Sequence, residues 1–408
     1  MKKITEKIAL SILYGAMIVG APAFAGVGQP ASLLNAHVVD LSCFDWQRDN
    51  KNHQFAYECK NNFFADASPA HQSKVGDSYY YGEGVKQDYS EASKWYRKAA
   101  VQGDAYAQFS LGYMYAKGEG LPRDSWLALK WLTKAAGNGF AAAQYSLADM
   151  YYYGEGVAVD FDKAVQWYTK AAEQNYSYAQ YSLGFMYKKG IGLHQNTALA
   201  TKWLTKAAEQ SHPEAQTSLA IMYLNGEGIE KNAKLGFEWF FKAAMQGHAE
   251  AQNNLGYMYR VGVGVEQNFE RALMWYQNAA RQGHATAQSS IGFMYHKGIG
   301  VEQNSDRAIE WYKKAGAQGN LIAQFNLALI FMKGEGVEQD LHQAARWFIV
   351  AASQGDVEAQ YYVGTLYQNG WGVTRDIQKA VEWFRLAGES GHDKAKHELE
   401  LLATSHSV

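Results

Sequence analysis

Hydrophobic and polar positions follow a block of 36 residues that recurs nine times along the chain. Gly-x-Gly turns begin, always 36 residues apart, at Gly82, Gly118, Gly154, Gly190, Gly226, Gly262, Gly298, Gly334 and Gly370. A tryptophan keeps the same interval from Trp95 to Trp383, and a glutamine keeps it from Gln72 to Gln360. A fixed period of roughly 20 to 50 residues is typical of a solenoid, in which each unit buries its apolar surface against its neighbours.

Each block predicts a pair of helices, and the block from Asp104 to Gly139 shows why. Leu111 and Met114 belong to an apolar stripe at helical spacing, which predicts a first helix, called helix A. A glycine pair ends that helix, and Asp124 then occupies the N-cap of a second helix, helix B. Small residues recur where the two helices approach each other, and we expect the tryptophan to fill the space beside them.

The ends of the chain do not follow the repeat. Residues 1–25 combine an early cluster of lysines, an apolar stretch and the sequence Ala-Phe-Ala, which predicts a secretory signal peptide cleaved after Ala25. We therefore expect an exported protein, periplasmic or secreted. No later segment is apolar for long enough to span a membrane, so we expect no transmembrane segment in the mature chain.

Four segments follow from these boundaries: the signal peptide, a non-repeating segment over 26–67, the repeats over 68–391, and a capping helix with a tail over 392–408. The two cysteines, Cys43 and Cys59, lie in the second segment. Export permits a disulfide, so one bridge between them is the simplest interpretation, and a pair of free thiols is the alternative. The fold class predicted for the chain is all-α.

Composition narrows the classes of function. Hydrophobic residues make up 48% of the chain, which is enough for an extensive core, and 38 basic residues face 40 acidic ones for a formal net charge of -2. A protein that binds nucleic acid by electrostatic attraction should show a basic excess, so that class is excluded. The same balance gives no reason to expect a polybasic membrane anchor.

Catalytic and cofactor motifs are missing from the sequence. It contains no S-x-x-K, G-x-S-x-G, H-E-x-x-H, P-loop or C-x-x-C motif, so we predict no enzyme and no cofactor. Histidines recur at one position of the block, at His212, His248, His284 and His392. They are either a metal row or residues at the start of helix A. Because stacked helices lie about 10 Å apart, they are too widely spaced to surround one ion, and we predict no metal site.

The repeating unit resembles the Sel1-like repeat, a relative of the tetratricopeptide repeat. Residues 251–283 reproduce the pattern A-Q-x-x-L-G-x-M-Y-x-x-G-x-G-V almost letter for letter and continue with its A-x-x-W and A-A elements. The resemblance implies a right-handed α/α superhelix. It also implies a non-enzymatic adaptor that holds other proteins, and exported bacterial members are linked to host-cell interaction or envelope assembly.

Helix A carries the candidate binding surface. Its arc opposite the core varies between repeats while the core arc does not, and in solenoids of this type helix A lines the concave side. Exposed aromatic side chains suit recognition of a protein or peptide, because they bury large areas with few rotamers to freeze. The candidate residues are Tyr106, Phe109, Tyr113, Tyr145, Asp149, Tyr178, Tyr181, Phe185, Asn253, Tyr257, Phe293, Phe325 and Tyr361.

Three alternatives stay open at this point. Some of these rings could instead pack between neighbouring A helices. The partner could be an envelope glycan or peptidoglycan, since aromatic grooves also bind sugars, or the protein could be a weak β-lactamase-like hydrolase. The repeated glutamine, by contrast, is expected to be structural and to bond across the interface between repeats.

Overall fold

The computed structural model describes residues 68–405. The predicted signal peptide, the segment over 26–67 with Cys43 and Cys59, and the last three residues of the tail lie outside the described residues. Among the described residues no helix is long and apolar enough to cross a membrane.

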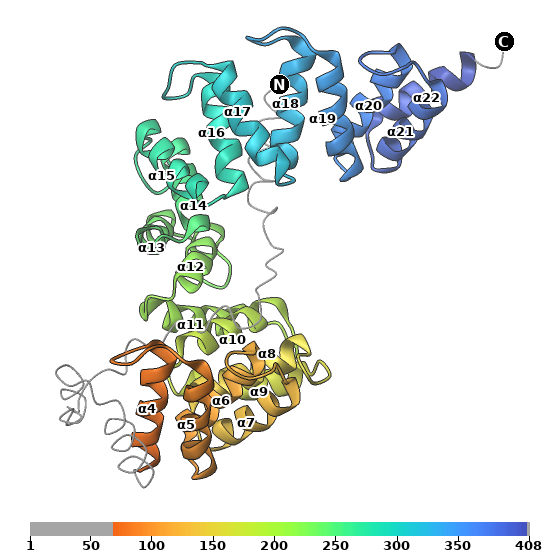
Figure 1. The fold of residues 1–408 in the computed structure, drawn as a ribbon. Coiled ribbons are helices and arrows are strands. Elements are labelled where there is room, and N and C mark those ends of the chain that lie inside the picture. The colour runs from red at the N-terminus through yellow and green to blue at the C-terminus, as the bar shows by residue number, and fades with distance from the viewer. Residues whose placement is uncertain (1–67, 406–408) are drawn as a thin grey trace. The chain divides into compact units, whose positions relative to one another are not determined.

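Residues 68–405 form nineteen helices and contain no strand, and they divide into two compact units, one ending at Gln210 and the other beginning at Ser211 (Figure 1). Unit 1 holds α4 (Pro69–Tyr81), α5 (Tyr89–Val101), α6 (Ala105–Lys117), α7 (Ser125–Gly137), α8 (Ala141–Tyr153), α9 (Phe161–Glu173), α10 (Ser177–Lys189) and α11 (Thr197–Glu209). Unit 2 holds α12 (Pro213–Asn225), α13 (Ala233–Met245), α14 (Ala249–Val261), α15 (Phe269–Arg281), α16 (Ala285–Lys297), α17 (Ser305–Ala317), α18 (Leu321–Lys333), α19 (Leu341–Ser353), α20 (Val357–Asn369), α21 (Ile377–Glu389) and α22 (Asp393–Ser405).

The helices alternate between A helices, with even numbers, and B helices, with odd numbers. The residues at the helix ends are the capping residues that the sequence predicts. Gly118 ends α6 in the left-handed conformation at φ 77°, and the Asp124 carboxylate accepts the Leu127 N–H at 2.9 Å to begin α7. An aspartate or asparagine caps every B helix in the same way. The all-α solenoid expected from the period is therefore confirmed within each unit.

Close contact between paired helices depends on the predicted small residues. A methyl group added at Gly112 of α6 would lie 2.9 Å from Leu132 Cγ on α7, so only glycine allows this approach. The neighbour that fills the space is the residue after the tryptophan, and the prediction that the tryptophan fills it was wrong. Trp347 instead reaches back to Gly316 on the preceding B helix, where an added Cβ would lie 3.2 Å from its ring.

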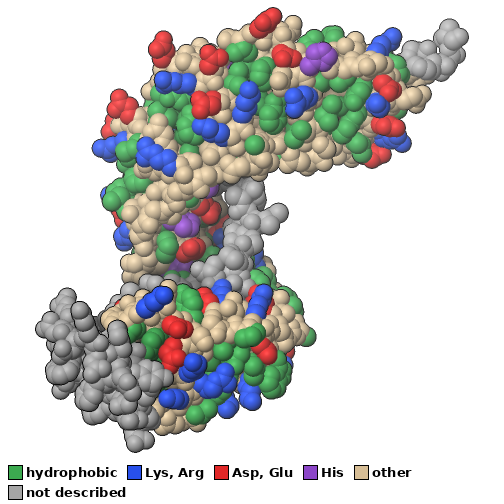
Figure 2. Space-filling model, viewed as in Figure 1, with side chains coloured by type: hydrophobic (Ala, Val, Ile, Leu, Met, Phe, Trp, Pro, Cys, Tyr) green, Lys and Arg blue, Asp and Glu red, His purple; other side chains and the backbone are tan. Residues whose placement is uncertain are grey.

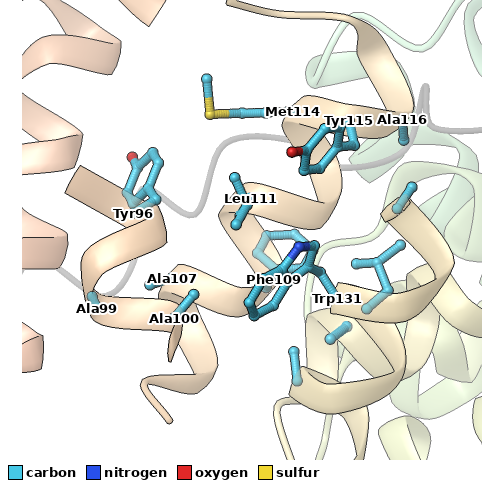
Figure 3. Packing of buried hydrophobic residues seen from close by; sticks show 14 of the residues in the cluster. Tyr96, Ala99, Ala100, Ala107, Phe109, Leu111, Met114, Tyr115, Ala116 and Trp131 are labelled. Atoms are coloured by element: carbon cyan, nitrogen blue, oxygen red, sulfur yellow. The ribbon is translucent and has the colours of Figure 1, made fainter. Parts of the chain in front are cut away.

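The core of each unit runs through its stack of helices. In unit 1, Tyr96 of α5, Leu111 and Met114 of α6, and Trp131 of α7 belong to one buried cluster (Figure 3). Because every A helix contacts the B helix on either side of it within its unit, one helix pair alone would leave an apolar stripe in water. Stability therefore comes from interfaces between neighbouring pairs.

The repeated glutamine links three consecutive helices. The Gln144 amide of α8 donates to the Ala136 carbonyl at the end of α7, 3.2 Å away. Its side-chain oxygen accepts from the Gln174 amide at the end of α9 at 2.7 Å. The same pair of bonds recurs along both units, with Asn138 in place of one glutamine. The expected structural role of this glutamine is confirmed.

Candidate partner-binding surface

The candidate residues occupy three positions on the A helices. The first position holds Tyr106 and Tyr178. The middle position holds Phe109, Tyr145, Tyr181, Asn253, Phe325 and Tyr361. The last position holds Tyr113, Asp149, Phe185, Tyr257 and Phe293. These three positions differ in how deeply they are buried and in what they contact.

The middle position packs inside the stack. Phe109 is 7% exposed and Tyr145 is 8% exposed, and Asn253 is buried as well. The Phe109 ring lies 5.2 Å from the ring of Phe140, and the Tyr145 ring lies 5.5 Å from the ring of Tyr176, measured between centroids. Figure 3 shows Phe109 among the core side chains of unit 1.

At five interfaces within the units, the middle position contacts the N-cap residue of the next A helix, 31 residues later. Thr217 Oγ1 and His248 Nδ1 lie 3.0 Å apart. The rings of Tyr361 and His392 stack with centroids 4.6 Å apart. A third such pair is polar, since the Ser73 hydroxyl donates to the Asp104 carboxylate at 2.9 Å. Variation at the middle position is therefore matched by variation at the cap.

This matching explains a variable position without invoking a partner. The alternative in which rings pack between neighbouring A helices holds for Phe109 and Tyr145, which offer little surface to a ligand. Tyr181, Phe325 and Tyr361 are half-buried. Sequence variation alone could not separate a surface that adapts to a partner from an interface that adapts to its neighbour.

The last position is buried at Asp149. The Tyr168 hydroxyl donates a short hydrogen bond to its carboxylate, and burial raises the pKa of Asp149 to about 7 even though that bond opposes the rise. Asp77 has the same arrangement and accepts from the hydroxyls of Tyr96 at 2.6 Å and Tyr106 at 2.7 Å. Asp149 is therefore an interior anchor, whereas Asp77, Tyr113, Phe185, Tyr257 and Phe293 are half-buried.

Two further positions of each A helix belong to this surface, four and eleven residues after the first position. Neither of them was predicted from the sequence. Residues at spacings of 4, 7 and 11 from the first position share one side of the helix, since eleven residues bring the chain back to within about 20°. We call this side the A-face. In unit 1 it comprises Ala70, Lys74, Asp77 and Tyr81; Tyr106, Ser110, Tyr113 and Lys117; Ala142, Ser146, Asp149 and Tyr153; and Tyr178, Ser182, Phe185 and Lys189.

The last residue of each A helix in unit 1 is an exposed part of the A-face. Tyr81 is 40% exposed and Tyr153 is 41% exposed, while Lys117 and Lys189 at the equivalent positions are exposed too. The helix wheel could have found them, because the glycine turn follows directly after them.

Cations lie beside rings of the A-face. In unit 1, Lys117 Nζ lies 5.8 Å from the ring centroid of Tyr113. In unit 2, the guanidinium of Arg260, the residue next to the A-face position of Val261, lies 5.4 Å from the ring of Tyr257 and 5.7 Å from that of Phe293 on the next A helix. The A-face of unit 2 begins in a more acidic region, where Glu214 is exposed and burial raises the pKa of Glu250.

The repeated histidines cap A helices. The Nδ1 atoms of His212, His248 and His284 accept the N–H three residues further on at 3.3 to 3.4 Å, and His392 does so at 3.1 Å. Burial lowers the pKa of His212 to about 4, because it disfavours the charged ring, and Glu214 opposes this in part. Within residues 68–405 no three His, Cys, Asp or Glu side chains lie close enough to hold a metal ion.

Known proteins share the repeat and the fold of this chain. A family model described as the Sel1 repeat matches residues 72–104, 105–140, 141–176, 177–212, 213–248, 249–284, 285–320, 321–356 and 357–392. No curated protein matched the chain.

Two solved structures are similar in sequence and in fold. One is a protective antigen of uropathogenic Escherichia coli strains displaying an SLR fold, with 34% identity over 83% of this chain and 80% of that one and a TM-score of 0.55. The other is a Sel1 repeat protein from Oxalobacter formigenes, with 33% identity over 76% of this chain and 89% of that one and a TM-score of 0.60.

Proposed function

Because the chain belongs to the Sel1 repeat family, whose solenoids generally serve as non-catalytic scaffolds for protein interactions, we propose that it holds a protein or peptide partner along the A-face. The proposal is carried by one observation: the A-face presents exposed tyrosines and lysines at the same place on successive A helices. The buried middle-position residues Phe109, Tyr145 and Asn253 are left out of the proposed surface.

The chemistry of unit 1 favours a peptide with both apolar and acidic groups. Tyr81 and Tyr153 offer exposed rings, and Lys117 and Lys189 offer cations between and beyond them. A tyrosine buries a large area while freezing few rotamers, and a lysine at the rim favours an acidic partner. The A helices are fixed by the core and the glutamine bonds, so little ordering is needed when the partner binds.

Capture of the partner with variant proteins tests this proposal. The A-face variant carries Tyr81→Ala, Lys117→Ala, Tyr153→Ala and Lys189→Ala, all at exposed sites where loss of the side chain should spare the core. Immobilised full chain is incubated with extract from the native organism, and bound proteins are identified by mass spectrometry. We expect a protein that wild type enriches and the A-face variant loses.

The matched control removes exposed apolar side chains from the B helices of the same unit, with Val101→Ala and Trp126→Ala. This control should capture the same partner as wild type. If the A-face variant keeps its helical circular dichroism and melting temperature and still captures every partner of wild type, the A-face is not the binding surface.

We also propose that the protein is exported and that its mature form begins at Gly26. The signal-like sequence of residues 1–25 supports this, and the similarity to a protein described as a protective antigen is consistent with a role in host interaction. N-terminal sequencing of the protein from periplasmic and culture-medium fractions tests it. A cytoplasmic protein that retains residues 1–25 would contradict the proposal.

A further inference from the structure

A row of lysines runs along the outer side of the B helices in unit 1. Two positions flank the repeated tryptophan on each B helix, the residue before it and the third residue after it. In unit 1, seven of these eight positions are exposed lysines, and Gln166 is the eighth. We call the set the lysine ridge: Lys94, Lys98, Lys130, Lys134, Lys170, Lys202 and Lys206.

The tryptophans hold part of the ridge in place. The Nζ atoms of Lys98, Lys134, Lys170 and Lys206 lie 4.2, 4.8, 4.1 and 4.8 Å from the ring centroids of the tryptophans three residues earlier. An ammonium group above an aromatic face is attracted to it, and the stem covers apolar surface. Figure 2 shows Lys and Arg side chains close together over α5 and α7.

The fold does not require this charge. In unit 2 the ten equivalent positions hold three cations and three glutamates, although the B helices have the same length and the same packing. These positions are Glu238, Lys242, Met274, Asn278, Glu310, Lys314, Arg346, Val350, Glu382 and Leu386. The overall charge of -2 therefore conceals a local basic surface in unit 1.

Few carboxylates neutralise the ridge. Glu91 pairs with Lys94 at 2.9 Å, and Asp162, Glu173 and Glu209 are the other acidic residues within α5, α7, α9 and α11. Those four helices carry nine Lys or Arg residues in total. An anionic surface would therefore meet an excess of positive charge that is largest on α5 and α7, where five Lys or Arg residues accompany one carboxylate.

An exposed tryptophan indicates which kind of anionic surface fits. Trp126 is 65% exposed at the start of α7, on the same side of the helix as Lys130 and Lys134, and Lys130 Nζ lies 5.2 Å from its ring. Tryptophan favours the headgroup region of a lipid bilayer, where its apolar ring and polar N–H are both accommodated. Neither a nucleic acid backbone nor an acidic peptide requires such a ring beside the lysines.

We propose that the lysine ridge docks unit 1 on a membrane surface rich in anionic phospholipid, with Trp126 inserted among the headgroups. Juxtaposed lysines attract anionic lipid additively, and the attraction falls with ionic strength. The A-face lies on the other helices of each pair, so a docked protein would keep it available to a partner. The inference does not depend on the proposed partner function.

Sedimentation with lipid vesicles tests the proposal. The full chain is mixed with vesicles of phosphatidylcholine alone or of phosphatidylcholine with phosphatidylglycerol, at low and physiological salt. The ridge variant carries Lys98→Gln, Lys134→Gln, Lys170→Gln and Lys206→Gln. We expect wild type to bind only the anionic vesicles, and the ridge variant to bind at least about tenfold more weakly.

Two controls distinguish loss of charge at the ridge from loss of charge elsewhere and from loss of folding. A unit 2 variant with Lys234→Gln, Lys242→Gln, Lys313→Gln and Lys314→Gln removes the same charge from exposed sites and should bind like wild type. An arginine version of the ridge variant keeps the charge and should also bind. Trp126→Ser should weaken the binding to anionic vesicles that remains at physiological salt.

Three results would overturn the proposal. In the first, wild type does not bind anionic vesicles. In the second, the ridge variant and the unit 2 variant lose binding equally, which would indicate general electrostatic attraction and no defined site. The third is binding to double-stranded DNA or polyglutamate without binding to vesicles, which would make the ridge a surface for a different polyanion.

Discussion

The Tyr361 ring stacks on the His392 ring with centroids 4.6 Å apart and planes 18° apart. The two residues lie 31 positions apart, one on α20 and the other at the start of α22. The same relationship joins serine to aspartate, phenylalanine to phenylalanine, tyrosine to tyrosine and threonine to histidine elsewhere in the array. These five interfaces thus each have their own matched pair, which should favour stacking in the correct order.

The Phe109–Phe140 pair predicts a measurable coupling. Phe109→Ala should destabilise unit 1 by about 3 kcal/mol, because it removes a buried aromatic ring. The double variant with Phe140→Ala should be less destabilised than the sum of the two single variants by about 1 kcal/mol. Urea unfolding of the four proteins measures this. Strict additivity would show that the two rings do not stabilise each other.

The end of the glutamine series predicts a stabilising substitution. The Gln360 side-chain oxygen is buried without a hydrogen-bond partner, because Ser390 occupies the place that a glutamine or asparagine holds in earlier repeats. Ser390→Gln should supply the missing donor and stabilise unit 2 by about 1 kcal/mol. Thermal melts would reveal this as a higher Tm than that of Ser390→Ala. An equal Tm for the two variants would refute the prediction.

Asp149 predicts that unit 1 loses stability as the pH rises. Its pKa is raised by burial to about 7 in the folded state, so between pH 4 and pH 7 the unfolded chain releases this proton first. The resulting loss should be on the order of a few kcal/mol. Asp149→Asn keeps an acceptor for Tyr168 but cannot ionise. Its free energy of unfolding should therefore depend less on pH over this range, which denaturation at several pH values can measure.

The capping histidines predict the opposite trend in unit 2. Burial lowers the pKa of His212, His248 and His284, so the unfolded chain takes up protons first as the pH falls below about 6.5, and stability is lost until about pH 4 for His212. Protonation also removes the acceptor for the helix N–H. Hydrogen exchange at Ala215, Ala251 and Ala287 should accelerate relative to intrinsic rates as the pH is lowered from 6 through 5 to about 4.

A natural control exists for the histidine prediction. Asn320 occupies the same position and accepts the Ala323 N–H at 2.9 Å without titrating. A variant with asparagine at the three histidine positions should keep its protection at pH 5. Equal loss of protection in this variant would assign the acid sensitivity to other groups.

The repeat and its caps were predictable from sequence because they depend on local rules. Glycine at a left-handed helix end and aspartate at an N-cap act within a few residues, so Gly118 and Asp124 carried their structural meaning in the sequence itself. The place of the tryptophan was not predictable in this way. Its neighbour Gly316 lies 31 residues from Trp347 on a different pair of helices.

The candidate surface was predicted only in part, for a similar reason. A helix wheel identifies the side that faces away from the paired helix, but not how far the next A helix covers it. Tyr145 packs against Tyr176, the cap of the next A helix, while Tyr153 on the same helix is open to water. The contact at a spacing of 31 residues decides this, and one isolated repeat does not reveal it.

The central claim is that the A-face holds a protein partner, and site-specific photocrosslinking tests it most directly. A photoreactive phenylalanine analogue is placed at Tyr153 on the A-face, at Trp126 on the B helix α7, and at Tyr145 inside the stack. The full chain is then irradiated in its native cells. The account predicts a discrete adduct with another protein from position 153 and none from positions 145 and 126. Protein adducts from position 126 alone would contradict it.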